Sequence, residues 1–439
     1  MSRALHSWGC YPYAPQTGHV CHWQSDVAAH AGNIVRLRGS TLPYGNGRSY
    51  GDSCLAFTSQ VLHMRGLDRF IQADWVNGLV CVEAGITLAE IFAITLPRGW
   101  FLPVTPGTQF VTCGGAIAND VHGKNHHRRG TFGAHVLRFG LMRHGVETVI
   151  CSRDEHPDLF AATIGGLGLT GVIVWAEIRL IPVRSSQIER TVMRFGELAE
   201  FFALSAERDA HHEYSVAWID CLAKGRRRGR GVFIVGDHAQ EGELTAAVPS
   251  RWYMPATPPF SMVNELSLRV FNEGYWRAHP ARRTRDRIGM QPFFYPLDRI
   301  LHWNRIYGRR GFQQYQCVIP EGAAKDALGE LLRVIADSGQ GSFLSVLKRC
   351  GEIVSPGLLS FPLPGVSLAL DFPHNARLEL ELFPRLDAIV RAGGGRLYPA
   401  KDAHMSGKDF RCSYPRWEQL EALRDPALMS RFWKRVTAV

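Results

Sequence analysis

The stretch PGTQFVTCGGAIANDVHGKNHH, residues 106–127, is the most informative part of this chain of 439 residues. Its first half contains the glycine turns Pro106-Gly107 and Gly114-Gly115, and its second half ends in a polar knot, His122–His127. Glycine lets backbone amides approach a large planar or phosphorylated ligand closely. Successive amides in such turns form an anion-binding nest. The stretch therefore predicts a ligand-binding turn, with an ordinary glycine-rich surface loop as the alternative.

Two more glycine clusters lie in the same amino-terminal block. Residues 43–53 read PYGNGRSYGDS, and residues 165–171 read GGLGLTG. The segment Thr87–Thr95 predicts a helix whose capping box pairs Thr87 with Glu90. Apolar or alternating patterns predict the strands Ile34–Arg38, Val61–Met64, Leu79–Glu83, Val136–Arg143, Glu147–Cys151 and Val172–Pro182.

The length of the chain exceeds what one hydrophobic core usually supports, so we expect two domains that meet near Val183. The second part mixes strands with two amphipathic helices, Ala323–Ser338 and Leu378–Ala392. Before them, Ala246–Phe260 is rich in proline and aromatic residues, and we expect it to be irregular and mobile. The strands expected in this part are Tyr214–Cys221, Gly231–Val235, Gly311–Ile319, Phe343–Lys348 and Ser367–Phe372.

The net charge of +10 is concentrated in arginine clusters at residues 226–230, 282–287 and 309–310. Such clusters suit the phosphates of nucleic acids or lipid headgroups, and a solvated basic loop is the alternative for each. No recognition-helix, zinc-finger or RNP pattern accompanies them, so we expect no nucleic-acid partner. The ten cysteines include no CxxC pair, which favours reduced, mostly buried thiols.

Neither a signal peptide nor a membrane-spanning helix is expected. The residues after Met1 have no apolar core, and no run of about 18 apolar residues exists. We therefore expect the protein in the cytoplasm or at a peripheral membrane surface.

Three local motifs suggest other chemistry and must be weighed. Residues 166–171 match GxGxxG, but the expected order around them is helix, loop, strand, the reverse of a dinucleotide-binding turn. Residues 47–51 match the GxSxG of serine hydrolases, yet no helical pattern follows Ser49. His122, His126 and His127 could ligate a metal, but no HExxH motif accompanies them, and we expect no metal site.

Five segments in this order resemble the decaprenylphosphoryl-β-D-ribose 2'-oxidase family, within the vanillyl-alcohol oxidase and p-cresol methylhydroxylase superfamily. They are GNGRSYGD, PGTQFVTCGGAIANDVHGKNHH, GGLGLTG, WNRIYGRRGFQQYQCVIP and GGRLYPAKD. The resemblance implies an α+β fold with a p-cresol methylhydroxylase-type FAD-binding domain and a substrate (cap) domain built on an antiparallel sheet with helices. It implies that the FAD-binding domain covers residues 1–183 and is completed by 396–439, and that the cap domain covers 184–395.

By motif matching, the same resemblance implies the residues of an FAD and substrate site. The catalytic residues would be Lys401, His122 and Tyr50, and the substrate would also contact Lys124, Gln314, Gln316 and Lys348. The FAD contacts would be Pro43, Tyr44, Gly45, Asn46, Gly47, Arg48, Ser49, Tyr50, Gly51, Asp52, Ser53, Gly107, Thr112, Cys113, Gly114, Gly115, Asn119, Asp120, Val121, His122, Ile173 and Tyr398.

The family resemblance implies oxidation of the ribose 2'-hydroxyl of a polyprenyl-phosphoribose, a lipid-phosphate sugar, by hydride transfer to flavin. Lys401 or His122 could hold the hydroxyl proton, and the sequence does not decide between them. Oxygen or a quinone would take the electrons, and a separate NAD(P)H-dependent short-chain reductase would complete the epimerisation. An aldonolactone or alditol oxidase and a flavin-free binding protein are the alternatives.

The chain departs from the family pattern at two places. Arg48 stands where many superfamily members link FAD covalently through a histidine, so we expect dissociable FAD. Phe294-Tyr295-Pro296, Ser367 and Ala369 differ from the usual tyrosine, asparagine and cysteine of the pocket. We therefore expect an altered sugar or lipid carrier, and no reaction with an inhibitor that needs the pocket cysteine.

Overall fold

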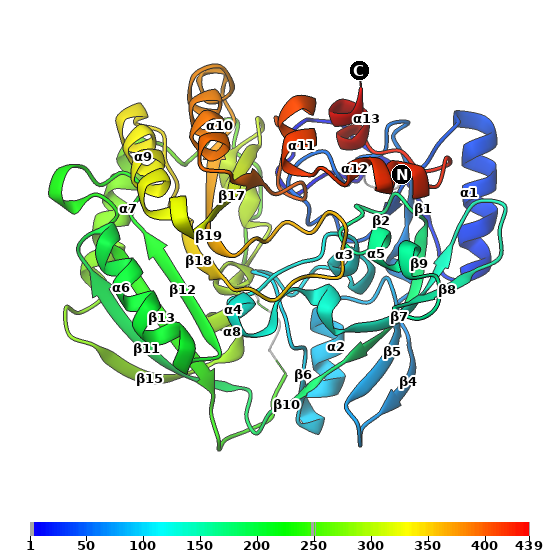
Figure 1. The fold of residues 1–439 in the computed structure, drawn as a ribbon, viewed down its shortest axis with the longest axis horizontal. Coiled ribbons are helices and arrows are strands. Elements are labelled where there is room, and N and C mark those ends of the chain that lie inside the picture. Colours follow the sequence, from blue (N-terminus) through cyan, green and yellow to red (C-terminus); the bar gives the residue numbers. More distant parts are fainter. Residues whose placement is uncertain (1–3, 247–249, 251, 439) are drawn as a thin grey trace.

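The computed structural model describes residues 4–246, 250 and 252–438. Two sheets stand side by side, and the predicted glycine turns lie between them (Figure 1). The predicted segment Ala246–Phe260 lies partly outside the described residues, at 247–249 and 251, as do Met1–Arg3. In the part of the chain that is described, no helix is both long and apolar enough to cross a bilayer.

The amino-terminal sheet is antiparallel and has the strand order β4-β5-β9-β7-β8. The predicted strands Val136–Arg143 and Glu147–Cys151 correspond to β7 and β8, which pair as an antiparallel hairpin. Thr87 caps helix α2 by accepting from the Glu90 amide, as the capping box predicts. Helix α3 begins at Thr112 inside the predicted ligand turn. The bounds are β4 (Phe70–Asp74), β5 (Leu79–Glu83), β9 (Val172–Arg179), β7 (Val136–Met142), β8 (Val149–Ser152), α2 (Leu88–Thr95) and α3 (Cys113–Ala118).

A small parallel sheet in the order β1-β3-β2 begins the fold, with helix α1 between β1 and β2 along the chain. The predicted strand Ile34–Arg38 is wrong, because these residues form the last turns of α1. The helix starts after Trp23 and ends at Gly39, whose φ of 85° is the left-handed conformation of a helix C-cap. The bounds are β1 (Thr17–Val20), α1 (Gln24–Arg38), β2 (Pro43–Tyr44) and β3 (Gln60–His63).

The second sheet, here called the cap sheet, is antiparallel and runs in the order β15-β11-β13-β12-β18-β19-β17-β20. Helices α6, α9 and α10 cover one of its faces (Figure 1). The bounds are β11 (Gln187–Phe195), α6 (Leu198–Arg208), β12 (Tyr214–Ile219), β13 (Gly231–His238), β15 (Thr284–Gly289), β17 (Phe312–Pro320), α9 (Glu321–Ser338), β18 (Ser345–Cys350), β19 (Gly365–Pro373), α10 (Phe383–Ala392) and β20 (Arg396–Leu397).

Alternation along the cap strands separates an apolar face from a polar one. Ala217, Leu347 and Leu368 belong to the core that packs against the covering helices. Their neighbours in sequence, such as Val346 and Lys348, point to the other face, where the cavity lies. One strand pattern therefore supplies both the core of the cap and one wall of the site.

Shorter elements connect these layers. The two-stranded pairs are β6 (Trp100–Phe101) with β10 (Ile181–Pro182), and β14 (Trp252–Tyr253) with β16 (Ile300–Leu301). The remaining helices are α4 (His126–Arg129), α5 (Pro157–Thr163), α7 (Glu265–Ala278), α8 (Met290–Phe294), α11 (Gly407–Ser413), α12 (Trp417–Leu423) and α13 (Arg431–Thr437). Single 3-10 turns are η1 (Met64–Gly66), η2 (Leu96–Arg98), η3 (Phe132–His135), η4 (Asp209–His211), η5 (Gly225–Arg227), η6 (Pro296–Arg299) and η7 (Trp303–Tyr307), and the π-helical turn η8 (Leu378–Leu382) leads into α10.

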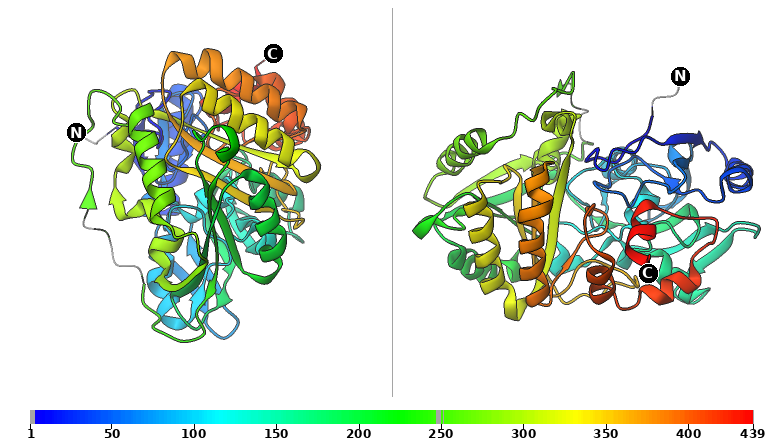
Figure 2. Two further views of the ribbon diagram at one scale, coloured as in Figure 1. Left: turned by 90° about the vertical axis from the view of Figure 1, so that its left-hand side faces the viewer. Right: turned by 90° about the horizontal axis from the view of Figure 1, so that it is seen from above.

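The carboxy-terminal segment returns to the first glycine turn, and Figure 2 (right) shows its helices beside the amino-terminal part. Arg435 forms ion pairs of 2.8 Å with both Asp52 and Asp402. Strand β20, at the start of the same segment, instead pairs with β17 of the cap sheet. The segment therefore ties both sheets together, and the predicted domain boundaries at 183 and 396 stay predictions.

Candidate active site

A cavity of about 300 Å³ lies between the glycine turns and the polar face of the cap sheet. Most of the residues that line it are buried or half-buried. Gly107 and Pro296 line it and are also exposed, so the cavity opens to solvent between them. A deep, mostly apolar cavity with convergent polar groups is the usual form of a cofactor and substrate site.

The first glycine turn packs so tightly that side chains are excluded. Gly47 has a φ of 60°, and a Cβ there would lie 2.0 Å from the Tyr44 hydroxyl. A Cβ on Gly45 would lie 2.3 Å from Thr112 Oγ1, the atom that caps helix α3. The first and second glycine turns therefore touch, and together they present bare backbone to one end of the cavity.

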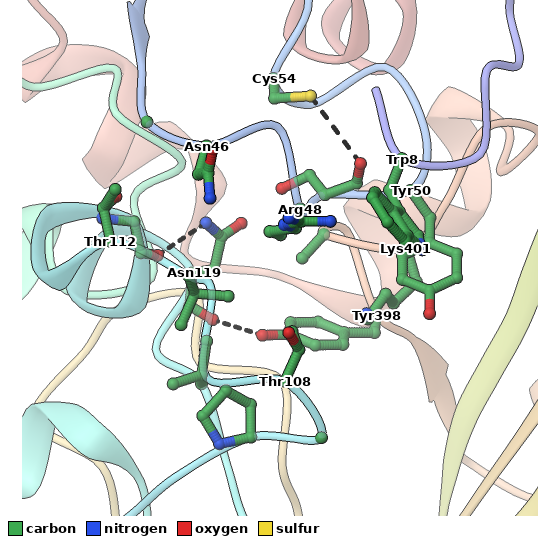
Figure 3. A pocket seen from close by; sticks show the side chains of 18 of the residues that line it. Trp8, Asn46, Arg48, Tyr50, Cys54, Thr108, Thr112, Asn119, Tyr398 and Lys401 are labelled. Carbon is green, nitrogen blue, oxygen red and sulfur yellow. Dashed lines mark hydrogen bonds between the residues drawn. The ribbon is translucent and has the colours of Figure 1, made fainter. Parts of the chain in front are cut away.

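Side-chain hydrogen bonds hold these turns in register, and Figure 3 draws the one between Tyr398 and Asn119. Asn46 donates from Nδ2 to the carbonyl of Phe110 at 2.8 Å, which joins the first turn to the second. The Tyr398 hydroxyl, from the carboxy-terminal segment, donates to the carbonyl of Asn119 at 2.7 Å. Three segments far apart in sequence thus form one rigid wall.

Arg48 is the basic residue of this wall. Its guanidinium lies 4.1 Å from the centroid of the Trp8 ring and 5.4 Å from that of Phe110. Burial lowers the pKa of Arg48, and the charge of Asp298 opposes that effect. Within the described residues, Arg48 Nε and Ser53 Oγ are buried without a hydrogen-bond partner. Unsatisfied donors on a glycine-rich wall fit a large ligand with phosphate and heterocycle acceptors.

The opposite end of the cavity is lined by three lysines. Burial lowers the pKa of Lys124 to about 7 and that of Lys348 to about 8, and the charge of Lys348 contributes to the shift of Lys124. Burial also lowers the pKa of Lys401 to about 7, although Asp371 acts in the other direction. The three ammonium groups come from different elements and converge on one space, which makes this end suited to an anion.

Lys401 lies over an aromatic ring and near a buried carboxylate. Its Nζ is 3.8 Å from the centroid of the Tyr50 ring. Asp371 accepts a hydrogen bond of 2.6 Å from Gln314 Nε2. Burial raises the pKa of Asp371 to about 7, against the effects of Gln314 and Lys401. Burial therefore disfavours the charged forms of both the Lys401 ammonium and the Asp371 carboxyl, and their mutual attraction opposes that effect.

His122 sits beside the second glutamine of the same strand. Its Nε2 lies 3.0 Å from Gln316 Nε2, so in this arrangement the histidine nitrogen accepts and Nδ1 carries the proton. Burial lowers the pKa of His122 well below its usual range, helped by Lys348, His126 and Lys401. The imidazole is therefore neutral at physiological pH.

Most of the predicted site residues line this cavity, although they come from segments distributed along the chain. Those that line it are Pro43, Gly45, Asn46, Gly47, Arg48, Ser49, Tyr50, Ser53, Gly107, Thr112, Gly114, Gly115, Asn119, Val121, His122, Lys124, Ile173, Gln314, Gln316, Lys348, Tyr398 and Lys401.

Five predicted FAD contacts lie behind the wall instead. The Tyr44 hydroxyl donates to the carbonyl of His6 at 2.6 Å, and Asp52 pairs with Arg435. Gly51 packs against the backbone of Asp402, where a Cβ would lie 1.7 Å from the carbonyl oxygen. Cys113 is fully buried in the apolar core. Asp120 is buried and accepts from the Gly133 amide at 2.9 Å. These residues shape the turns without lining the cavity.

Sequence reasoning missed several residues of the wall. Asp298 accepts from Thr108 Oγ1 at 3.1 Å and from the Gln109 amide at 2.9 Å, and it faces the Arg48 charge. Burial raises the pKa of Asp298 to about 6. Trp8 and Trp303 also line the cavity. The Pro296-Leu297-Asp298 sequence was an available signal for Asp298, whereas no local pattern marks Trp8.

The structure does not support the other chemistries. No helix follows Ser49, whose turn continues into irregular backbone, so the GxSxG match is not a nucleophile elbow. The GxGxxG match lies between helix α5 and strand β9, as expected, and therefore cannot be a Rossmann turn. Among the described residues, no group of three or more His, Cys, Asp or Glu side chains is arranged to hold a metal ion.

Comparisons with known proteins show which family this chain belongs to. A family model described as an FAD binding domain matches residues 24–152. Decaprenylphosphoryl-beta-D-ribose oxidase of Mycolicibacterium smegmatis is 36% identical over 399 residues, covering 87% of this chain and 85% of that protein. An uncharacterised protein of Streptomyces coelicolor is 36% identical over 356 residues, covering 77% and 95%. A putative D-arabinono-1,4-lactone oxidase of Neurospora crassa is 27% identical over 195 residues, covering 40% and 34%.

The fold, the glycine-lined wall and these relatives define an FAD-dependent oxidoreductase that acts on CH–OH groups. The bare backbone of the turns and the unsatisfied donors of Arg48 and Ser53 fit FAD as the cofactor of this wall. The chain belongs to the decaprenylphosphoryl-β-D-ribose oxidase family.

Proposed function

We propose that this protein oxidises the 2'-hydroxyl of a polyprenylphosphoryl-β-D-ribose to the 2'-keto sugar. The convergence of Lys124, Lys348 and Lys401 on one end of the cavity is the observation that carries this proposal. The three half-buried lysines repel one another when charged and lose part of their hydration, so the site favours an anionic substrate that compensates for both effects. A neutral alditol or aldonolactone would leave these charges uncompensated, which disfavours the soluble-sugar alternative.

Oxidation of the hydroxyl removes a hydride from carbon and a proton from oxygen, and FAD, when bound, supplies the hydride acceptor. Lys401 is the group we assign to the proton, because its lowered pKa leaves a substantial neutral fraction at pH 7. His122 is less suited, since its Nε2 lone pair already accepts from Gln316. Its Nδ1–H instead offers a donor to a sugar oxygen, and within the described residues that nitrogen has no partner.

Asp371 and Gln314 position Lys401 and the sugar. The 2.6 Å hydrogen bond from Gln314 Nε2 to Asp371 uses the amide donor and leaves the amide oxygen available as an acceptor for a sugar hydroxyl. Asp371 is fully buried, and it raises the proton affinity of Lys401 electrostatically. It acts behind the site as a positioning residue.

Lys124 and Lys348 are assigned to the phosphate. Lys348 faces the cavity from β18, and Lys124 comes from the polar knot, where its Nζ donates to the Phe294 carbonyl at 3.4 Å. A bound phosphate would hold both lysines in their charged form, since a nearby negative charge raises a lysine pKa. The sugar would then extend from the phosphate toward Lys401.

The identity of the sugar and of the lipid carrier is left open by the altered pocket. Ala369 lines the cavity where the family commonly carries a cysteine, and it pairs in register with Gln316. Ser367 is buried next to Gln316 and opposite Lys348. A smaller residue at 369 enlarges the space beside the glutamines, which supports a carrier or sugar that differs from that of the Mycolicibacterium relative.

FAD is proposed to bind without a covalent link, because Arg48 replaces the histidine that forms such links. Its guanidinium stacks on Trp8 and has no nucleophilic lone pair at neutral pH. Acid precipitation of the purified protein tests this proposal. Flavin absorbance should appear in the supernatant, and a yellow pellet would contradict it.

Two partners complete the proposed reaction. The 2'-keto product requires a reductase to become the arabinose epimer, and an NAD(P)H-dependent short-chain enzyme supplies that chemistry. Oxygen or a quinone would take up the two electrons removed from the sugar. The electron acceptor follows from the redox balance of the oxidation, and the reductase follows from the proposed epimerisation.

Anaerobic bleaching of the flavin absorbance tests the proposed function. A short-chain polyprenylphosphoryl-β-D-ribose should bleach the purified enzyme, whereas free ribose, pentitols and aldonolactones should not. Bleaching by the neutral sugars at lower concentration than by the phosphoribose would contradict the proposal and favour the lactone or alditol oxidase.

A further inference from the structure

Among the described residues, exposed apolar side chains are most concentrated on β14, on the segment after it, on helix α7 and on β16. We define this set as the apolar patch: Trp252, Tyr253, Phe260, Met262, Leu266, Val270, Phe271 and Ile300, each at least 44% exposed. Other exposed apolar residues, such as Val76 and Val354, are scattered over separate loops. Isolated exposed apolar residues are ordinary, but a contiguous group marks an interaction surface.

Backbone pairing makes the patch continuous. Trp252 and Tyr253 pair in parallel with Ile300 and Leu301. The Met262 amide donates to the carbonyl of Ile306 at 2.8 Å, which fastens the start of α7 to the same segment. Figure 2 (left) shows this part of the chain along the outer edge of the molecule.

Helix α7 is apolar on two sides. Tyr275 packs on Trp218 of β12 with ring centroids 4.7 Å apart, and Leu268 is buried, so one side faces the cap sheet. Leu266 and Val270, one turn apart, are 72% and 67% exposed on another side. The described fold does not bury this second apolar side of α7, which indicates a surface that binds a partner outside the chain.

The basic residues around the apolar patch indicate which kind of partner binds it. Residues 252–310 contain ten arginines and four acidic residues. Arg269 lies between Leu266 and Val270 on α7, where it forms an ion pair of 2.8 Å with Glu265, and Arg299 directly precedes Ile300. Within the described residues, Arg299, Arg309 and Arg310 have no carboxylate at ion-pair distance. Exposed aromatic and aliphatic side chains flanked by arginine are the chemistry of an anionic bilayer surface.

The patch adjoins the mouth of the cavity. Pro296 is exposed and lines the opening, and Trp303 lines the cavity from the inside. The patch residue Ile300 lies between them in sequence, so the segment 296–303 leads from the cavity to the patch. A lipid tail that leaves the cavity at Pro296 would therefore emerge at this surface.

We propose that the apolar patch docks the protein on an anionic lipid bilayer, with Leu266, Val270, Trp252 and Tyr253 inserted and the neighbouring arginines at the headgroups. This surface presents the cavity mouth to membrane-embedded substrate. The proposal rests on the proposed function only for the identity of that substrate. Binding to a bilayer is argued from the exposed apolar side chains of the patch and the arginines beside them.

Vesicle flotation of the FAD-loaded enzyme tests the docking surface. Wild-type protein should float with phosphatidylcholine vesicles that contain phosphatidylglycerol and should bind pure phosphatidylcholine less, and raised salt should weaken binding to the anionic vesicles. The double variant L266E/V270E should bind about tenfold less, because it places two carboxylates on the inserted stripe. The matched variant V354E, at an 87% exposed residue outside the patch, should bind like wild type. Equal binding of all three proteins, or no binding by wild type, would overturn the proposal.

Two further measurements distinguish bilayer docking from an effect on catalysis and from a contact between copies of the chain. Bleaching of L266E/V270E by a water-soluble short-chain phosphoribose should match wild type, whereas its turnover of vesicle-embedded substrate should fall with binding. If wild type binds vesicles but no phosphoribose bleaches it, the surface stands and the proposed function fails. If the double variant changes only the oligomeric state in size-exclusion chromatography, the patch is a contact between copies and the bilayer proposal fails.

Discussion

The two ends of the cavity use opposite means to bind a ligand. The end formed by the glycine turns offers backbone amides, small side chains and stacked rings, with Arg48 as its basic residue. The other end, which faces the cap sheet, offers long side chains from three segments: Lys348 of β18, Lys124 of the polar knot and Lys401 of the carboxy-terminal segment. Gly45 and Gly47 illustrate the first end, where a single added carbon would collide with a neighbour.

The glycine end binds its ligand by close steric fit, whereas the lysine end is suited to bind by charge. The glycine end recognises a large, constant cofactor, so close packing of the backbone suffices and side-chain substitutions fail by steric clash. In the proposed reaction, the lysine end binds a charged substrate and accepts a proton, which suits groups whose pKa values burial has brought near 7. Substitutions at the lysine end should therefore change the reaction rate, KM and pH profile, whereas substitutions at the glycine end should change the free energy of unfolding.

The largest effect is expected at the lysine end, on the chemical step. Replacement of Lys401 by Met should lower the rate of anaerobic flavin bleaching by about 10²- to 10⁴-fold, because it removes the proton acceptor. Flavin content, read from the absorbance spectrum, should stay near wild type. The exposed Lys408→Met variant is the control. Bleaching of K401M at the wild-type rate would remove Lys401 from the chemistry.

Removal of a lysine that contacts the phosphate in the proposed complex should weaken substrate binding. Replacement of Lys124 or Lys348 by Met should raise KM about 10- to 100-fold with a smaller change in kcat, because a charge-assisted hydrogen bond is lost. The exposed Lys325→Met variant should leave both constants unchanged. A fall in kcat at constant KM would assign these lysines to the reaction instead.

The pH dependence distinguishes the lysines from one another. Lys401 must be neutral to accept a proton, so kcat/KM should rise with pH through its pKa of about 7. Lys124 and Lys348 must be charged to bind phosphate, so kcat/KM should fall as the pH rises through their pKa values of about 7 and about 8. A bell-shaped profile results.

The variant Asp371→Asn sharpens this assignment. Because the Asp371 charge raises the pKa of Lys401, its removal should move the rising limb to lower pH by roughly one unit. The falling limb should stay in place. An unchanged rising limb would show that Asp371 does not act on Lys401.

The smallest effect is expected at the glycine end, on stability. Replacement of Gly45 by Ala should lower the free energy of unfolding by about 1–3 kcal/mol, because the new Cβ overlaps Thr112 Oγ1. Thermal unfolding followed by flavin release measures it. Gly322→Ala on helix α9, where a Cβ meets open space, should be neutral or stabilising. Equal midpoints for both variants would contradict a tight contact between the glycine turns.

Local patterns predicted elements that are set by neighbours in sequence. Strand β5, the α2 capping box and the β7–β8 hairpin lie where alternation and turn residues placed them. The strand expected at Ile34–Arg38 failed because its apolar run ends a helix that begins ten residues earlier at Gln24. The partner of Asp52, Arg435, lies 383 residues away along the chain, so no local pattern reveals it.

The sequence by itself determined the glycine turns, because close backbone approach depends on which residues lack a side chain. It also determined, through motif resemblance, which lysines and glutamines belong to the predicted site. Only the tertiary structure decided that Lys401, from the carboxy-terminal segment, lies over Tyr50 of the first turn, and that Asp371 stands behind Gln314. Burial and mutual charge bring pKa values near neutrality, and both depend on how distant segments pack. The exposed stripe of α7 is likewise a product of packing, since the same helix buries Leu268 and leaves Leu266 uncovered.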